Sequence, residues 1–125
     1  MNKVIYTEKA PAAIGPYSQA ILAGNTLYIS GQIPVNPATG NIEAKDITGQ
    51  AQQSLTNIKN ILEEAGYTFD DVVKTTCLLS DIKDFAAFNE VYSKFFTGMK
   101  PARSCFGGNQ LPKGALVEIE VTAVK

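Results

Sequence analysis

Residues 115–124 alternate between side chains of two kinds, and this run constrains the fold more than any other part of the chain. One set is Val117, Ile119 and Val121; the other is Leu116, Glu118, Glu120 and Thr122. Because successive side chains of a β-strand point to opposite faces, this period of two predicts a strand with one apolar face. The second face then carries two carboxylates.

An arginine precedes this strand in the segment Pro101–Phe106, and we expect the two segments to form a terminal hairpin. The planar guanidinium of Arg103 can bind a carboxylate through two parallel hydrogen bonds. Glu118 on the polar face could hold or activate a water molecule. The ordinary alternative is that Arg103 is a solvated charge and that the glutamates mark the wet face of an antiparallel sheet. These residues alone favour that alternative.

Length and composition limit the classes of function. A chain of 125 residues with 45% hydrophobic and 18% charged residues is typical of one ordered domain, which we place at residues 1–125. A net charge of −1 gives no general reason to bind nucleic acid or an anionic membrane. The absence of histidine excludes Ser-His and Cys-His catalysis and histidine-based metal sites, so we expect no metal site.

The two cysteines and the N-terminus indicate a cytoplasmic protein. Cys77 and Cys105 both lie in apolar, strand-like surroundings and form no secreted disulfide framework, so reduced thiols are expected. The N-terminus lacks the layout of a signal peptide, and no apolar run is long enough to span a membrane. We interpret Cys77 as a core residue.

The remaining patterns predict an α+β chain with the element order β-β-β-α-β-α-β-β. The expected strands cover residues 4–6, 17–23, 26–32, 72–79, 101–106 and 115–124, with a two-residue hairpin at Gly24-Asn25. Asp46 is expected to cap a helix that continues to Ala65 and stops at Gly66. Its buried stripe is Ala51, Leu55, Ile58, Leu62 and Ala65, while Gln50, Gln53, Asn57 and Lys59 fall mostly outside it.

A second helix begins at Asp81 or Asp84 and carries the aromatic stripe Phe85, Phe88, Tyr92 and Phe95. Two helices can cover only one face of a sheet of about six strands. The other face bears Leu116 as well as Glu118, so we expect further copies of the chain to cover it, most simply in a cyclic oligomer. A ligand site would then lie in the crevices between subunits.

Six segments, in order and at compatible spacing, resemble the reactive-intermediate (enamine/imine) deaminase family, also called the YjgF/YER057c/UK114 family. The resemblance covers essentially the whole chain. The segments are Ala13–Ala20, Ser30–Pro34, Val73–Thr76, Phe85–Tyr92, Pro101–Cys105, and Leu111–Gly114 continued by Glu118–Glu120.

This resemblance implies a chorismate-mutase-like fold of the bacillary type: a six-stranded mixed sheet with two helices on one face, assembled as a homotrimer with clefts between subunits. It also implies a hydrolase that acts without a cofactor on 2-aminoacrylate/2-iminopropanoate and 2-iminobutanoate. The products would be 2-oxo acids and ammonia, and the reaction would protect pyridoxal-phosphate enzymes.

The resemblance also implies roles for individual residues. Arg103 and Glu118 would be catalytic, with Arg103 binding the substrate carboxylate and Glu118 handling the proton of the attacking water. The expected substrate-binding residues are Tyr17, Ser30, Gly31, Asn89, Arg103 and Cys105. Cys105 is expected to be a cleft-wall residue and not a nucleophile, because no histidine could activate it and burial would raise its pKa. From the residues alone, Tyr17 is more often an ordinary half-buried strand aromatic, and Gly31 could serve only a close backbone approach at a bend. Asn89 could be a helix-face residue without a ligand, and only the family match makes it a candidate.

One segment departs from the family pattern, and two other functions remain open. Many members carry apolar residues where this chain has Gly108-Asn109-Gln110, which puts the pocket wall and the substrate range in question. The first alternative function is a non-catalytic trimer that binds 2-oxo acids and regulates a partner. The second is an endoribonuclease, for which the net charge and the lack of a basic-aromatic cluster make the weakest case.

Overall fold

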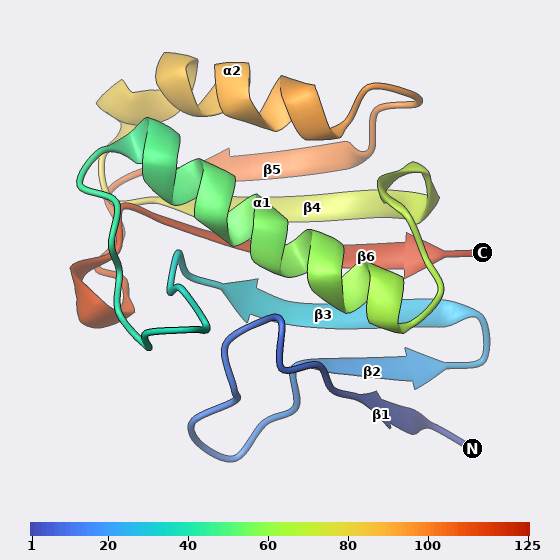
Figure 1. Cartoon of the computed structure of the whole chain (residues 1–125). Helices are drawn as coiled ribbons and strands as arrows, with labels where there is room; N and C mark the ends of the chain where they lie inside the picture. Colours follow the sequence, from blue (N-terminus) through green and yellow to red (C-terminus); the bar gives the residue numbers. More distant parts are fainter.

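The computed structural model describes all 125 residues as one six-stranded sheet with two helices on one face, as predicted (Figure 1). The strand order is β1-β2-β3-β6-β4-β5. The strands are β1 (Lys3–Ile5), β2 (Ala20–Ala23), β3 (Thr26–Gln32), β4 (Val72–Leu79), β5 (Ala102–Phe106) and β6 (Val117–Val124), and the helices are α1 (Ile47–Glu64) and α2 (Phe85–Phe95). Three short 3-10 turns cover Phe69–Asp71, Ile82–Asp84 and Pro112–Gly114.

The sheet is mixed because one of its five pairings is parallel. β4 and β5 run parallel and are joined through α2, whereas the other neighbours are antiparallel. The predicted terminal hairpin is therefore wrong: β4 lies between β5 and β6. The crossover through α2 brings β5 back to the outer edge of β4. Alternation along a strand does not reveal which neighbour it pairs with.

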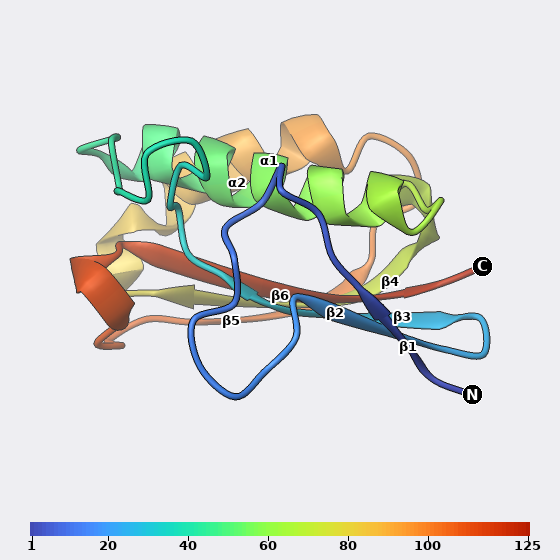
Figure 2. The ribbon, with the colours of Figure 1, turned by 60° about the horizontal axis from the view of Figure 1, so that its bottom comes forward.

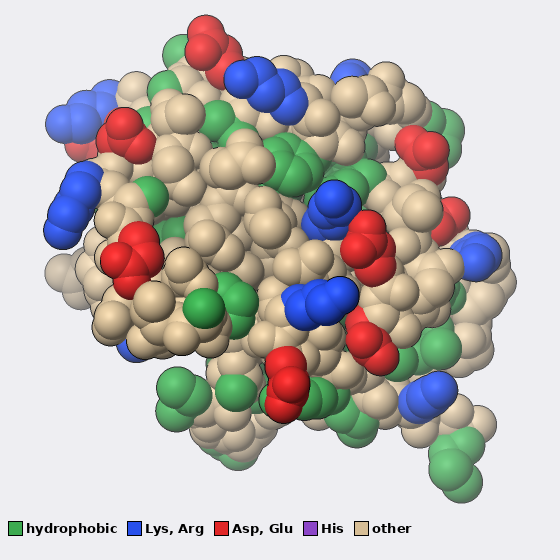
Figure 3. Space-filling view, viewed as in Figure 1, with side chains coloured by type: hydrophobic (Ala, Val, Ile, Leu, Met, Phe, Trp, Pro, Cys, Tyr) green, Lys and Arg blue, Asp and Glu red, His purple; other side chains and the backbone are tan.

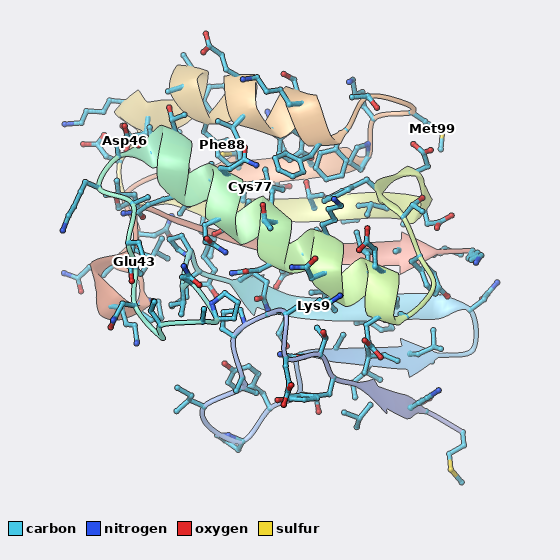
Figure 4. The ribbon with its side chains drawn as sticks, in the orientation of Figure 1. Lys9, Glu43, Asp46, Cys77, Phe88 and Met99 are labelled. Atoms are coloured by element: carbon cyan, nitrogen blue, oxygen red, sulfur yellow. The ribbon has the colours of Figure 1, made fainter.

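β6 has the two faces that its sequence predicts. Val117, Ile119 and Val121 are buried beneath the helices, while Glu118 is half-buried and Glu120 exposed on the opposite face. The covered face packs against α1 and α2 in a single core of 23 buried residues. In Figure 4, Cys77 of β4 and Phe88 of α2 are labelled in this interior, and both are fully buried.

Helix α1 begins and ends where the sequence indicates. The Asp46 carboxylate accepts a hydrogen bond from the Gly49 amide at 2.9 Å, and Gly66 follows the helix with a left-handed φ of 80°. Asp81 caps the turn before α2 by accepting from the Lys83 amide, whereas Asp84 makes no such bond. Neither helix combines the length and hydrophobicity needed to cross a bilayer.

Two predictions are wrong, one about polar residues of α1 and one about where the second strand begins. Gln50 and Asn57 are buried, although they lie outside the predicted apolar stripe of α1, because both bind backbone groups of neighbouring loops. Residues 17–19 are not part of a strand. The side chain of Gln19 instead binds the backbone of residues 7–11 and folds this segment into a loop. The predicted hairpin at Gly24-Asn25 is confirmed.

The second face of the sheet carries no helix. Figure 2 shows both helices on one side and, on the other, only the loop before β2 reaching past the strands. Large apolar side chains on this face are open to solvent in the single chain: Tyr28 is 53% exposed and Phe106 is 56% exposed. Buried and exposed apolar surface therefore lie on opposite sides of the same strands.

Candidate active site

Two separate cavities contain all but one of the predicted site residues. The larger, about 790 Å³, is lined by Tyr17, Ser30, Gly31 and Glu118 and is called here the Glu118 pocket. The smaller, about 310 Å³, is lined by Asn89 and Arg103 and is called the Arg103 pocket. Within one chain, the two residues predicted to be catalytic are therefore not brought together.

Buried amide side chains shape the walls of the Glu118 pocket. Gln19 accepts a hydrogen bond from the Thr7 amide at 2.8 Å and donates to the Pro11 carbonyl at 2.8 Å, which fixes the loop that carries Tyr17. Asn57 donates at 2.9 Å to the carbonyl of Val35, which also lines the pocket. Because buried backbone groups need partners, these amides hold loops that lie outside the strands of the sheet.

An irregularity in β3 creates the floor of this pocket. The register between β3 and β6 shifts between Ile29 and Gln32, so Ser30 and Gly31 fall out of the ladder. The Ser30 amide donates to the Gln19 carbonyl at 2.9 Å, and its hydroxyl donates to the Ser18 carbonyl at 2.6 Å. The Ser30 side chain is thus engaged in holding the loop.

Gly31 lies directly against the carboxyl group of Glu118. A Cβ atom at position 31 would come within 2.9 Å of the Glu118 Cδ atom and would overlap its Oε2 atom. Only a residue without a side chain leaves this space to the carboxylate. Burial raises the pKa of Glu118 above its ordinary value, and the negative charge of Glu120 raises it further. A carboxyl group of this kind exchanges protons more readily near neutral pH than an ordinary surface glutamate does.

Tyr17 lies at the rim of the same pocket. It is 53% exposed, and its hydroxyl makes no hydrogen bond within the chain. The phenol is therefore free to contact a molecule in the pocket, and the binding role of Tyr17 stays a prediction.

Arg103 lies on the edge strand β5, where its guanidinium contacts α2. It donates one hydrogen bond to the Asn89 side-chain oxygen at 2.8 Å. The guanidinium carbon lies 4.7 Å from the centre of the Tyr92 ring and 5.4 Å from that of Phe85. No carboxylate pairs with it, since the one ion pair of the chain joins Lys83 and Asp81. Most of its donors remain available to an anion.

The register of the sheet places Arg103 and Glu118 on opposite faces. Arg103 is level with Thr75 of β4, and Thr75 is level with Val121 of β6, a row that points toward the helices. Glu118 lies three residues before Val121 in β6 and points to the uncovered face. No change of rotamer could bring these two groups of one chain together.

Cys105 lines neither cavity. It lies beside Cys77 in the register of β4 and β5 and is half-buried. Burial raises the pKa of the Cys105 thiol, as the sequence suggested, and raises the pKa of Cys77 to about 12. Both thiols are therefore protonated at neutral pH.

The segment Gly108-Asn109-Gln110, which departs from the family pattern, also lies outside both cavities. The Asn109 side chain donates to the backbone carbonyls of Leu79 and Phe106 at 3.0 Å each. The polar side chain of Asn109 therefore stabilises the turn after β5. No group of three or more His, Cys, Asp or Glu side chains could hold a metal ion.

Sequence reasoning missed the surroundings of both charged residues. The sequence predicts Tyr92 only as part of an aromatic helix stripe, yet its ring supports the Arg103 guanidinium. The sequence places Asn57 mostly outside the buried stripe of α1, yet it binds the Val35 carbonyl in a pocket wall. Two signals were available in the sequence: the hydroxyl of Tyr92 among phenylalanines, and the amide side chain of Asn57 within a helix. Neither signal shows which group the side chain binds.

Comparison with known proteins places the chain in a family. Residues 7–125 match the family described as Endoribonuclease L-PSP. A RutC family protein of Pyrococcus horikoshii is 55% identical over 125 residues, covering 100% of this chain and 99% of that protein. A 2-iminobutanoate/2-iminopropanoate deaminase of Capra hircus is 50% identical, covering 100% of this chain and 91% of that protein.

The fold is likewise that of solved structures. The crystal structure of E. coli TdcF with bound serine superposes with a TM-score of 0.94 at 46% identity, covering 98% of each chain. Sequence and structure agree over the same residues, so the resemblance carried by the six motifs is confirmed. This chain belongs to the Endoribonuclease L-PSP family, which is the enamine/imine deaminase (YjgF/UK114) family of its motifs.

Proposed function

We propose that this protein hydrolyses 2-aminoacrylate/2-iminopropanoate and 2-iminobutanoate to 2-oxo acids and ammonia, without a cofactor. One observation carries the proposal: the chain has two pockets with complementary groups. The Arg103 pocket offers a cation for the substrate carboxylate, and the Glu118 pocket offers a carboxyl group for proton transfer. The deaminase name of the Capra hircus relative and the serine bound to E. coli TdcF support a small substrate that carries a carboxylate.

The two pockets would meet between subunits of a homotrimer with a chorismate-mutase-like arrangement. The uncovered face of the sheet supports this assembly, because it exposes Tyr28 and Phe106 together with the open side of the Glu118 pocket. Exposed apolar surface next to a polar cleft is typical of an interface. Arg103, at the sheet edge of one subunit, would reach over the Glu118 pocket of its neighbour.

In this shared site Arg103 binds the substrate carboxylate through two parallel N–H···O bonds, and Asn89 holds the guanidinium from behind. The imine carbon then lies over the Glu118 pocket, where Tyr17 contacts the substrate or its water. Cys105, two residues beyond Arg103, would contribute its backbone at the cleft wall.

Glu118 supplies the proton transfers. Its carboxylate takes a proton from water as the water oxygen bonds to the imine carbon, and it passes this proton to the imine nitrogen, giving a carbinolamine. Glu118 then takes the proton of the carbinolamine hydroxyl and delivers it to the amino nitrogen. The C–N bond breaks, and ammonia and the 2-oxo acid leave. Water and imine are thus consumed in equal amounts, and no redox step is involved.

The replacement Glu118→Gln tests this function against a 2-oxo acid binding protein without catalysis. A serine or threonine dehydratase generates the imine, and release of pyruvate or 2-oxobutanoate is followed with and without the protein. We expect the parent to accelerate release and the variant to lose about 100-fold or more of this activity. Binding of 2-oxobutanoate by calorimetry should change by less than about threefold.

The opposite outcome would support a regulatory trimer: binding of 2-oxobutanoate by a parent protein that never accelerates product release. Ribonuclease activity is the remaining alternative, because the matched family carries that name. Charges of both signs are interspersed over the helix-covered face in Figure 3, and the net charge is −1. RNA cleavage that persists at constant specific activity through purification would favour it over the deaminase.

A further inference from the structure

The Arg103 guanidinium rests on an aromatic ring that is itself held by a buried hydrogen bond. Tyr92 is only 8% exposed, and its ring lies 4.7 Å from the guanidinium carbon. A cation over an aromatic face is attracted by the negative charge of that face, most strongly where water is excluded. The tilt of the Tyr92 ring therefore determines the plane in which Arg103 presents its free donors.

The Tyr92 hydroxyl fixes that tilt. It lies 2.8 Å from the Thr75 hydroxyl oxygen, and either group can donate. Thr75 is fully buried and occupies the position on β4 directly beside Arg103 on β5. Arg103 is thus paired with Thr75 across the strands, Thr75 is hydrogen-bonded to Tyr92, and the Tyr92 ring contacts the Arg103 guanidinium. The three residues form a closed loop of contacts.

Packing alone does not require these two hydroxyl groups. Phe88 and Phe96 flank Tyr92, with ring centres at 5.6 Å and 4.4 Å, so a phenylalanine would suit this stripe equally well. A buried hydroxyl is costly unless it is paired, and its bond is directional. Burial also raises the pKa of Tyr92, so the phenol keeps its proton throughout the neutral range.

We propose that Tyr92 and Thr75 are positioning residues that orient the Arg103 guanidinium for the substrate carboxylate. The nature of the ligand rests on the proposed function, whereas the orientation of Arg103 is a property of the free protein. A carboxylate needs both parallel hydrogen bonds in one plane, so a freely tilting guanidinium would bind it more weakly.

The variants Tyr92→Phe, Thr75→Val and their combination test this role. Thr75→Val leaves the buried Tyr92 hydroxyl without a partner, and Tyr92→Phe leaves the Thr75 hydroxyl only the long contact with the Cys77 thiol at 3.9 Å. The double variant has neither hydroxyl, so stability should fall in the singles and recover in the double. The affinity for the ligand should not recover with stability in the double variant. In all three we expect KM for the imine and Kd for 2-oxobutanoate to rise ~3- to 10-fold, with kcat within about twofold, because the lost contact concerns ground state and transition state alike.

Tyr67→Phe is the matched control. Tyr67 is 5% exposed, and its hydroxyl donates to the Asn25 carbonyl at 2.7 Å, away from both pockets. This variant should lose stability without a change in KM or Kd. Thr75→Ser keeps the hydroxyl and should retain parental affinity. Unchanged KM and Kd in Tyr92→Phe and Thr75→Val would overturn the proposal and leave the pair a purely structural role.

A readout without substrate separates this proposal from the proposed function. The Arg103 Nε–Hε signal of the free protein, assigned by NMR through its absence in Arg103→Lys, reports the environment of the guanidinium. We expect this signal to move toward that of a free arginine in Tyr92→Phe and Thr75→Val but not in Tyr67→Phe. This shift would support the positioning role even if the parent proved inactive, and an unmoved signal would contradict it even in an active enzyme.

Discussion

At the scale of the residue, the carboxyl group of Glu118 occupies the space that a side chain at position 31 would fill. The glycine at this position is explained by that contact. Its neighbour Ser30 is explained by its bond to the loop at Ser18. Position 31 therefore offers a way to move the Glu118 carboxylate without replacing it.

Gly31→Ala should displace the Glu118 carboxylate from the pocket floor. Because a carboxylate at the end of a flexible side chain can swing away, we expect the free energy of unfolding to change by less than about 1 kcal/mol. Imine turnover should fall at least ~10-fold, since misplacing a proton-transfer group costs much of its contribution. Turnover by the coupled assay and thermal unfolding measure the two effects.

Gly98→Ala is the matched control for this change. A Cβ at position 98 would meet the Oδ1 atom of Asp70 at 2.6 Å, so it also displaces a carboxylate, but one outside both pockets. Turnover should be unaffected. An equal loss of turnover in both variants would show that Gly31 acts through general stability only.

Glu120→Gln should move the acid limb of the pH–rate profile. Burial first, and the charge of Glu120 second, raise the pKa of Glu118 above the ordinary 4.5. Glu118 acts as a base when ionised, so turnover is lost as the pH falls through this raised pKa. Removing the neighbouring charge lowers the pKa of Glu118, and the acid limb should move to lower pH. Glu63→Gln, on the exposed side of α1, should leave the limb in place, and a limb unmoved by both changes would contradict the assignment.

At the scale of the element, helix α1 combines predictable and unpredictable features. Its start at Asp46, its stop at Gly66 and its apolar stripe follow from local chemistry, which a single sequence contains. The burial of Gln50 and Asn57 depends on loops that are distant in sequence. A polar side chain becomes a core residue only when a neighbour presents an unpaired backbone group, and no periodicity encodes that neighbour.

Asn57→Asp should destabilise the protein strongly. The Asn57 amide donates to the carbonyls of Val35 and Ile33, and a carboxylate there would face two acceptors while buried. We expect a loss of roughly 3 kcal/mol in the free energy of unfolding. Asn60→Asp, which loses a similar bond to the Lys9 carbonyl at the surface, should cost less than about 1 kcal/mol because water replaces the partner. Denaturant unfolding measures both, and equal losses would contradict the anchoring role of Asn57.

At the scale of the whole molecule, one face of the sheet is buried by helices and the other is exposed. The sequence was sufficient to predict this arrangement, because two helices cannot cover both faces of six strands. It was not sufficient to predict the pairing of the last two strands, which depends on the crossover through α2. The consequence for the site is large: with β4 between β5 and β6, Arg103 and Glu118 of one chain face opposite ways.

A mixture of Arg103→Ala and Glu118→Gln subunits tests whether two chains share one site. Each variant alone should be nearly inactive. In a cyclic trimer of both kinds, one of the three interfaces joins an intact arginine to an intact glutamate. Random assembly from equal amounts should therefore restore about one quarter of the parental turnover. Activity no higher than that of the separate variants, in a sample whose mixed trimers are verified by native mass spectrometry, would contradict a site formed by the two faces of neighbouring chains.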